Sequence, residues 1–249
     1  MSLRGIDLSF DAEKVTPEWA AKQIASGITI AVCDLWTGNR AIPAARRALR
    51  YWREAGGKTG VYFVVHDSRP VSEHFQLARD VARDEWDYAE RHAIDVEVDP
   101  TSPITVLAAA AAVLASGGRP ILYTGWGKWL ELTGDSHACA HLPLWDASHG
   151  IRPSLEMYRQ YGGWTGPLIG HQYTNTTDLD GIAVDFNVFA DDFARSAVAG
   201  PKSDEEWLNA LDVLRGWSGR FPALAAELAQ GNREIADVRA IIERLRGGG

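Results

Sequence analysis

The chain has 249 residues, of which 46% are hydrophobic and 23% are charged, so it can build one large barrel domain or two modest ones. Its formal net charge of -8, without a cluster of Lys and Arg, argues against a protein that binds nucleic acid by neutralising phosphates. No apolar stretch is long enough to cross a membrane, and the first residues lack the basic and apolar segments of a secretion signal. Nothing in the sequence calls for an oxidising compartment, so Cys33 and Cys139 are expected to be unpaired thiols.

Short apolar segments alternate with helical patterns over the first two thirds of the chain, which is typical of a parallel sheet with crossover helices. Strands are predicted at residues 5–9, 28–35, 59–65, 94–98, 120–124, 142–146, 169–173 and 182–187. Helices are predicted at residues 17–26, 43–55, 72–92 and 105–115, two of them after the start signals Thr16-Pro17 and Thr101-Ser102-Pro103. The connections between the last strands carry Gly, Asn and Thr instead of helical periodicity. We therefore expect an α/β fold, an irregular eight-stranded TIM-like β/α barrel with incomplete outer helices.

A second organisation begins after Gly200-Pro201, where the strand pattern stops and a helical pattern follows. We predict a barrel domain over residues 1–199 and a helical C-terminal region over residues 200–249. Apolar residues in that region recur at spacings of three and four, namely Trp207, Leu211, Leu214, Phe221, Leu224, Leu228, Ile235, Val238, Ile242 and Leu245. Two interpretations are equally favoured: a coiled-coil seam that forms a homo-oligomer, and a helix or helical hairpin packed against the barrel.

Acidic side chains occur on three of the predicted strands. In Asp95-Val96-Glu97 the two carboxyl groups lie two residues apart, and a strand sends alternate side chains to the same face. Asp7 lies on the first strand and Asp185 on the last, where Asp185 and Asn187 point away from their apolar neighbours. Because functional side chains gather at the carboxyl ends of barrel strands, we expect these carboxylates to form one acidic cluster. Burying unpaired charges costs several kcal/mol, so a purely structural role for all of them is hard to sustain.

The Asp95-Glu97 pair suits acid and base chemistry. Neighbouring carboxyls cannot both ionise freely, so one keeps its proton near neutral pH while the other carries charge, which is the division that glycoside cleavage needs. Taken alone, the tripeptide has two other interpretations, a solvated strand edge and a metal site that includes Asp99. We expect no metal and no cofactor, because His92 is the only histidine near these carboxylates in the sequence.

Four segments, in chain order, resemble the glycoside hydrolase family 25 muramidases, which are lysozymes of the Chalaropsis type. They are Gly5-Ile6-Asp7-Leu8-Ser9, Asp95-Val96-Glu97, Leu144-Trp145-Asp146-Ala147-Ser148, and Gln172-Tyr173-Thr174 followed by Gly181-Ile182-Ala183-Val184-Asp185-Phe186-Asn187. Two segments depart from the family pattern, the turn Ser9-Phe10-Asp11-Ala12-Glu13 and the run Tyr62-Phe63-Val64-Val65-His66-Asp67. Substrate contacts near those two loops are therefore expected to differ from those of the family.

The resemblance implies roles for these residues. Glu97 would be the general acid and base, Asp95 would assist the reacting centre by orienting the 2-acetamido group of the sugar, and Asp7 and Asp185 would complete the acidic site. Substrate contacts would come from Tyr62, Tyr123, Trp145, Gln172 and Trp126. Among the ten tryptophans, Trp164 is also expected near the cleft, since aromatic rings stack on the C–H faces of sugars.

The implied function is an N-acetylmuramidase that cleaves the β-1,4 bond between N-acetylmuramic acid and N-acetylglucosamine, with peptidoglycan glycan strands as partner. The missing secretion signal and the helical appendage favour a phage endolysin, held in the host cytoplasm until it is released to the wall. An intracellular or exported bacterial enzyme is the alternative origin. Two other classes stay open: a non-catalytic carbohydrate-binding barrel, and a metal-dependent barrel hydrolase that would lose activity with a chelator.

Overall fold

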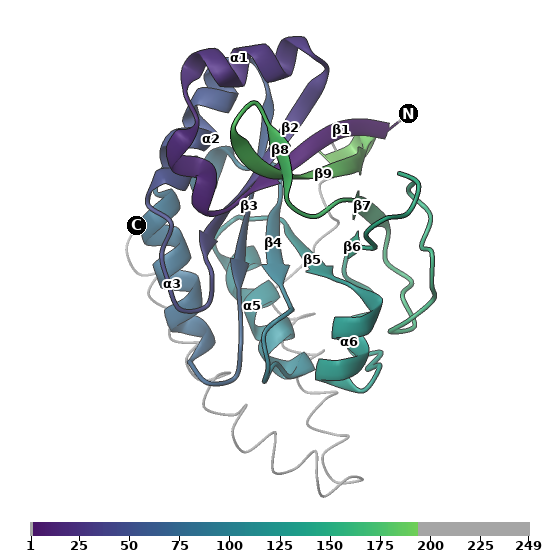
Figure 1. Ribbon diagram of the computed structural model, residues 1–249. Coiled ribbons are helices and arrows are strands. Elements are labelled where there is room, and N and C mark those ends of the chain that lie inside the picture. Colours follow the sequence, from purple (N-terminus) through teal and green to yellow (C-terminus); the bar gives the residue numbers. More distant parts are fainter. Residues whose placement is uncertain (1, 194–249) are drawn as a thin grey trace, which may run out of the picture.

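The computed structural model describes residues 2–193, and the barrel strands run side by side through its centre (Figure 1). Neighbouring strands follow the order β1-β2-β3-β4-β5-β6-β7-β9, and β9 also pairs with β1, which closes the barrel. The irregular eight-stranded barrel predicted from the sequence is therefore confirmed. The barrel strands are β1 (Ser2–Leu8), β2 (Ile28–Trp36), β3 (Lys58–Val64), β4 (His92–Asp95), β5 (Pro120–Thr124), β6 (Leu144–Ala147), β7 (Leu168–Gln172) and β9 (Ile182–Ala190).

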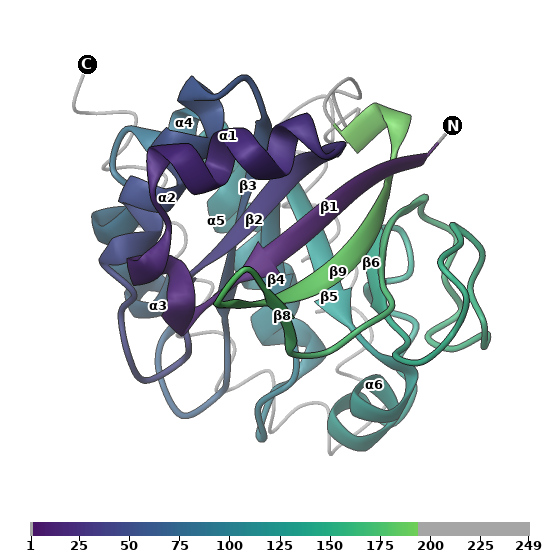
Figure 2. The ribbon, with the colours of Figure 1, turned by 45° about the horizontal axis from the view of Figure 1, so that its top comes forward.

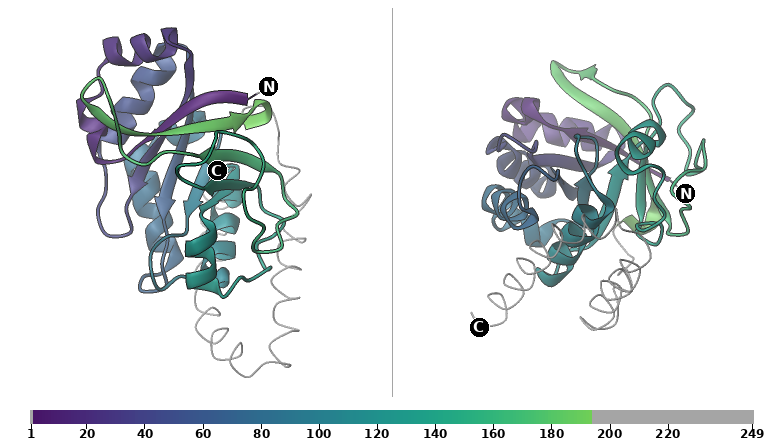
Figure 3. Two further views of the ribbon diagram at one scale, coloured as in Figure 1. Left: turned by 45° about the vertical axis from the view of Figure 1, so that its right-hand side comes forward. Right: turned by 90° about the horizontal axis from the view of Figure 1, so that it is seen from below.

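The helices cover one side of the barrel and leave the other side to loops (Figures 2 and 3). They are α1 (Pro17–Ala25), α2 (Ala44–Glu54), α3 (Val71–Ala82), α4 (Glu85–Tyr88), α5 (Pro103–Ala115) and α6 (Trp126–Thr133), with short 3-10 helices η1 (Phe10–Lys14) and η2 (Asp191–Phe193). The connection between β6 and β7, residues 148–167, is described throughout and contains no helix. The expectation of an incomplete outer layer on that side is confirmed.

Both predicted helix start signals act as expected. The Thr16 hydroxyl oxygen accepts a hydrogen bond from the backbone N–H of Trp19 at 3.2 Å, and Pro17 occupies the first turn of α1. The Ser102 hydroxyl does the same for Thr105 at 3.4 Å, at the start of α5. Each cap satisfies a backbone donor that the first helical turn leaves without an intrahelical partner.

The single helix predicted over residues 72–92 is wrong, because the chain breaks between α3 and α4. Arg83 adopts a φ of 51°, a left-handed backbone that ends α3, and His92 already belongs to β4. The apolar spacing continues across the break because Trp86 of α4 packs against Phe75 of α3, with ring centroids 5.4 Å apart. The helix α6 was not predicted, since its eight residues are too few for a clear periodic pattern.

The last barrel strand runs opposite to the direction predicted from the sequence. The first seven strands are parallel, whereas β9 is antiparallel to both β1 and β7. It follows the short strand β8 (Thr177–Leu179) through the two-residue turn Asp180-Gly181, and both turn residues have positive φ, as this kind of tight hairpin requires. The mouth end of an antiparallel strand is its N-terminal half, so Asp185 still lies at the mouth, directly opposite Asp7 in the strand pairing.

A compact apolar floor closes the barrel interior below the mouth. The buried residues Ile30, Val32, Ala93, Ile121, Tyr123, Trp145, Ile169, Phe189 and Phe193 form it. Two glycines make room for Phe189, since a Cβ at Gly5 or Gly170 would lie 2.6 or 2.7 Å from its ring. This packing fixes the strands whose ends carry the polar side chains of the mouth.

Three sequence predictions concern other parts of the chain. Cys33 and Cys139 are both buried and unpaired, as expected. Within residues 2–193, no helix is long and apolar enough to cross a membrane. The domain boundary at residues 199–200, the helical C-terminal region and its coiled-coil seam lie outside the described residues and stay predictions.

Candidate functional site

The predicted acidic cluster forms at the mouth of the barrel. Asp7 of β1, Asp95 at the end of β4, Glu97 two residues beyond it and Asp185 of β9 all line one cavity of about 110 Å³. The same cavity is lined by Tyr62, Tyr123, Trp145 and Gln172, so the structure brings together every predicted site residue except Trp126. Residues from positions 7 to 185 meet here because the barrel strands that carry them end around a common centre.

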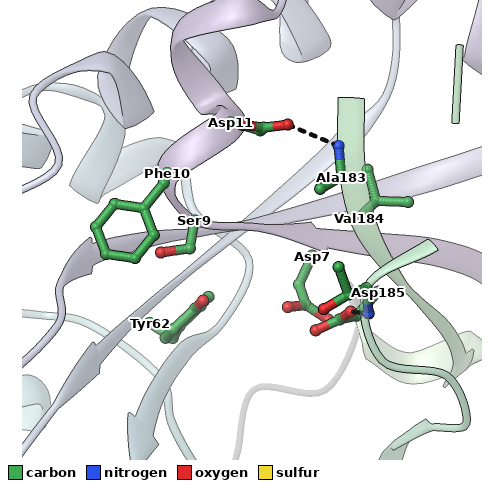
Figure 4. A pocket seen from close by; sticks show the side chains of 9 residues that line it. Asp7, Ser9, Phe10, Asp11, Tyr62, Ala183, Val184 and Asp185 are labelled. Carbon is green, nitrogen blue, oxygen red and sulfur yellow. Dashed lines mark hydrogen bonds between the residues drawn. The ribbon is translucent and has the colours of Figure 1, made fainter. Parts of the chain in front are cut away.

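A second, more open cavity of about 290 Å³ adjoins the first and shares Asp7, Tyr62 and Asp185 with it (Figure 4). Its other lining residues are Ser9, Phe10, Asp11, Thr176, Ala183 and Val184. The Asp11 carboxylate accepts a hydrogen bond from the backbone N–H of Ala183 at 2.8 Å, which ties η1 to the β8–β9 hairpin. Phe10 is 55% exposed, so the outer cavity offers an apolar surface to a ligand.

Asp7 and Asp185 form a pair whose oxygens are well supplied with donors. Asp7 Oδ2 accepts hydrogen bonds from Gln172 Nε2 at 2.9 Å and from Asn187 Nδ2 at 2.7 Å. Asp185 accepts from the backbone N–H of Thr176 and, at 3.4 Å, from Gln172 Nε2. Burial and the nearby Asp185 charge raise the pKa of Asp7 to about 8, against the two hydrogen bonds that favour its ionised form. Burial also raises the pKa of Asp185.

The Asp95 and Glu97 pair differs, because one of its carboxylate oxygens is bare, that is, buried without a hydrogen-bond partner among residues 2–193. Asp95 is 5% exposed, and its buried Oδ1 has no hydrogen-bond partner among residues 2–193. Burial, followed by the charge of Glu97, raises the pKa of Asp95 well above its usual range. Burial also raises the pKa of Glu97, while His149 and Lys128 act in the opposite direction. The pair can therefore hold a proton at neutral pH and offer an acceptor oxygen to a ligand.

Aromatic rings form one wall of the inner cavity. The ring centroids of Tyr123 and Trp145 lie 4.6 Å apart, and Tyr62 meets Trp145 edge-on at 6.3 Å. Trp145 is buried and donates its Nε1 hydrogen to Asn187 Oδ1 at 2.8 Å, so it serves as a fixed wall of the cavity. Tyr123 donates to Gln172 Oε1 at 2.9 Å.

Two predicted sugar contacts lie away from both cavities. Trp126 begins α6 on the rim of the mouth, and the Arg159 guanidinium lies 4.2 Å from its ring centroid. Trp164 packs edge-on against Trp129 with centroids 5.1 Å apart and donates to the Leu142 carbonyl oxygen at 2.8 Å. The expectation of Trp164 near the cleft is wrong, because this tryptophan fills the space between the β6–β7 connection and α6.

Two polar residues at the mouth were missed from the sequence. Asp34 of β2 is 3% exposed and accepts hydrogen bonds from the Ser9 hydroxyl at 2.8 Å and the Trp36 backbone N–H at 3.0 Å. Burial raises the pKa of Asp34 to about 7. The signal was a single charge inside the apolar run 28–36, which indicates a special environment.

The second missed residue is His149, in the connection after β6. Its Nε2 lies 2.6 Å from Gln172 Oε1, although the two residues are 23 positions apart. No local pattern marks such a contact, because it depends on how an irregular loop folds back. The adjacent His171 bonds the backbone of Ser148 and Ser154 and holds this loop.

The carboxylates of Asp7 and Asp185 are directed at hydrogen-bond donors and not at a shared metal position. Their donors are side-chain amides and a backbone N–H. Within residues 2–193, no group of three or more His, Cys, Asp or Glu side chains has the arrangement to hold a metal ion.

No family model matches the chain. A stretch of 69 residues is 32% identical to "Probable GH family 25 lysozyme 3" of Dictyostelium discoideum, and this match covers 27% of the chain and 14% of that protein.

The fold is similar to that of several solved structures. For the family GH25 lysozyme from Aspergillus fumigatus the TM-score is 0.61 at 16% identity, covering 79% of this chain and 100% of that one. For the muramidase from Trichobolus zukalii it is 0.59 at 19% identity, covering 78% and 99%. For the CTP1L endolysin it is 0.58 at 16% identity, covering 77% and 67%. The resemblance to glycoside hydrolase family 25 is confirmed, and at these identities the structural likeness establishes the fold.

Proposed function

We propose that this chain, which has the fold of the glycoside hydrolase family 25 lysozymes, is an N-acetylmuramidase. It hydrolyses the β-1,4 bond between N-acetylmuramic acid and N-acetylglucosamine in the glycan strands of peptidoglycan. The observation that carries the proposal is the convergence of Asp7, Asp95, Glu97 and Asp185 on one cavity. The local match to a protein named as a family 25 lysozyme supports the same substrate class.

Glu97 acts as the general acid. Its pKa is raised by burial, as an acid that protonates the glycosidic oxygen near neutral pH requires. In the free site Asp95 competes for that proton, because its own pKa is raised well above the usual range. A substrate amide N–H that donates to the bare Asp95 Oδ1 stabilises ionised Asp95 and leaves the proton on Glu97. Substrate binding thus places the proton where bond cleavage needs it.

The reaction then proceeds at C1 of the muramic acid residue. As the bond from C1 to the glycosidic oxygen breaks, its electron pair stays with the oxygen, which takes the Glu97 proton. The 2-acetamido oxygen of the same sugar attacks C1, while Asp95 holds the amide N–H and stabilises the positive charge. A water molecule then attacks C1, while the bond from C1 to the acetamido oxygen breaks and returns its electron pair to the acetamido group. The water gives a proton to Glu97, which restores the acid. Direct attack by Asp95 on C1 is the competing route.

The two adjoining cavities suggest the path of the glycan strand. The inner cavity holds the reacting sugar between Glu97 and the aromatic wall of Tyr62, Tyr123 and Trp145. The outer cavity, with the exposed ring of Phe10, receives the next sugar, whose C–H face packs on an aromatic ring. This outer part coincides with the turn that departs from the family pattern, so the contacts there are specific to this chain.

We also propose that the enzyme acts on the bacterial cell wall as a phage endolysin, held in the host cytoplasm until release. One protein of similar fold is an endolysin, which supports this origin.

The proposal is tested with Glu97→Gln, which keeps the shape of the side chain and removes the acid. We expect the rate of turbidity clearing of purified peptidoglycan to fall by about 10²–10⁴-fold. Co-sedimentation with insoluble peptidoglycan should be retained. The matched control is Glu131→Gln, an exposed glutamate of α6, which should clear walls at the wild-type rate.

Each outcome separates the competing classes. Equal clearing by the wild type and the Glu97→Gln variant would exclude Glu97 as the acid. Binding without clearing by either would favour the non-catalytic carbohydrate-binding barrel, and loss of clearing with a chelator would favour the metal-dependent hydrolase. Mass spectrometry of borohydride-reduced products should find muramic acid at the new reducing end, whereas reduced N-acetylglucosamine would mean a different enzyme class.

A further inference from the structure

The side-chain amide of Gln172 bridges the two carboxyl groups of the Asp7 and Asp185 pair. Its Nε2 donates to Asp7 Oδ2 at 2.9 Å and to Asp185 Oδ2 at 3.4 Å. Rotating the amide by half a turn would place its carbonyl oxygen against two carboxylates, so the observed orientation is the favourable one. In this orientation Gln172 Oε1 faces the other way and needs donors of its own.

Two donors supply that oxygen, and one of them is His149. Tyr123 donates its hydroxyl hydrogen at 2.9 Å, and His149 Nε2 lies 2.6 Å away from the same Oε1. Because Oε1 is an acceptor, the ring nitrogen that faces it must carry a hydrogen. His149 is an exposed residue, so its contact with Gln172 lies at the solvent side of the mouth.

The charged groups around His149 come from several elements. Glu97, in the segment after β4, and Asp185 of β9 both have a pKa that burial raises, and the His149 charge offsets part of that rise. Lys128 of α6 acts on Glu97 in the same direction. Asp7 of β1 lies behind the Gln172 amide and shares its hydrogen-bond chain. A proton on His149 therefore acts on the pKa of one carboxyl in each pair, Glu97 in one and Asp185 in the other.

We propose that His149 is a positioning residue of this site, which locks the Gln172 amide toward Asp7 and Asp185. The inference rests on the proposed function, since it gives His149 a part in the same reaction. His149 touches no reacting atom, and it acts through Gln172 and through its charge.

Three variants separate the hydrogen bond from the charge. His149→Phe removes both, and His149→Gln keeps an N–H that can reach Gln172 but carries no charge. His137→Phe is the matched control, since His137 is also exposed and lies outside both cavities. With soluble peptidoglycan fragments, we expect His149→Phe to lower kcat by about three- to tenfold with little change in KM, and His149→Gln to recover most of it.

The pH dependence of kcat gives the second readout. Both His149 variants lose the positive charge that opposes proton retention by Glu97, so the alkaline limb should move to higher pH. The control should show neither change. The positioning role is overturned if His149→Phe and His137→Phe give the same kcat and the same alkaline limb, or if His149→Gln is as impaired as His149→Phe.

A readout without turnover keeps this test separate from that of the muramidase proposal. In ¹³C-labelled protein, the titration midpoint of the Glu97 carboxyl should rise in His149→Phe, and the Gln172 side-chain amide signals should shift. If the wild type cleaves no peptidoglycan and these NMR changes still occur, the muramidase proposal fails and the role of His149 stands. If the enzyme is active and the Glu97 and Gln172 signals do not respond, the role of His149 is excluded.

Discussion

The two carboxyl pairs at the mouth differ in how their oxygens are satisfied. The pair of Asp7 and Asp185 receives hydrogen bonds from two side-chain amides and one backbone N–H. The pair of Asp95 and Glu97 lies in the same cavity, yet the buried Asp95 Oδ1 has no partner among residues 2–193. Asp7 and Asp95 are equally buried, each 5% exposed, so the difference comes from the neighbouring residues and not from depth.

This difference separates a pair that supports the structure of the mouth, Asp7 and Asp185, from a pair that is open to a ligand, Asp95 and Glu97. A buried acceptor without a hydrogen bond costs about 1–3 kcal/mol, which the free protein bears at Asp95 and which a ligand N–H would recover. Asp7 Oδ2 already accepts two hydrogen bonds and offers no such gain. We therefore expect substitutions at the Asp95 and Glu97 pair to damage activity more than stability, and substitutions around the Asp7 and Asp185 pair to do the reverse.

The largest expected effect is at Asp95. Asp95→Asn should lower kcat/KM for peptidoglycan by about 10²–10³-fold, since it removes the charge that holds the substrate amide and stabilises the transition state. The free energy of unfolding at pH 7 should rise, because the variant no longer buries a carboxyl that resists ionisation in the fold. Turbidity kinetics and urea denaturation measure the two quantities.

Asp7→Asn is the matched comparison, since its amide oxygen can still accept from Gln172 or Asn187. Its loss of kcat/KM should be at least about tenfold smaller than that of Asp95→Asn, because the acceptor role of Asp7 survives the change. Equal losses at the two positions would abolish the distinction between a reactive pair and a supporting pair.

The next effect is on stability, at Asn187. This side chain is fully buried and joins Asp7 to Trp145, accepting from the indole and donating to the carboxylate. Asn187→Ala leaves both groups without that partner, so we expect the free energy of unfolding to fall by about 2–4 kcal/mol. Urea denaturation should show this fall, whereas Asn39→Ala, an exposed asparagine before α2, should change stability by less than about 0.5 kcal/mol. A similar loss in both variants would contradict the supporting role.

The barrel could be predicted because each strand is a short apolar run bounded by turn residues, and such runs depend on local sequence. The direction of β9 depends on the tight turn at Asp180-Gly181, and it was missed because eight similar strands suggested a uniform parallel barrel. The break at Arg83 was hidden because Trp86 keeps the apolar spacing on its far side. These errors arise where tertiary packing preserves a pattern that local backbone geometry interrupts.

The residues of the site also fall into those that the sequence could predict and those that it could not. Asp7, Asp95, Glu97 and Asp185 could be found because strand position and alternation place them at the mouth. His149 could not, since its contact with Gln172 depends on the path of an irregular connection. Asp34 carried a usable signal, a charge within an apolar strand, but its partner Ser9 lies 25 positions away and no local pattern marks that contact.

The smallest expected effect tests whether Asp34 belongs to the supporting side of the mouth. Its pKa is raised from 3.8 to about 7 by burial, so the folded protein binds this proton more tightly than the unfolded chain does. Raising the pH through that window therefore favours unfolding, and the free energy of unfolding should decline between pH 4 and pH 7. Asp34→Asn should make this decline shallower, while the contribution of Asp7, whose pKa is about 8, should persist.

Urea denaturation at several pH values measures these slopes, with the exposed Asp87→Asn as control. The Asp34→Asn variant should keep most of its activity, because the new amide oxygen can still accept from the Trp36 N–H and the Ser9 hydroxyl can accept from the new amide N–H. An unchanged slope would mean that the Asp34 carboxyl is solvated in solution. A loss of activity as large as that of Asp95→Asn would instead place Asp34 with the reactive pair. The mouth would then contain three reactive carboxyls, Asp34, Asp95 and Glu97.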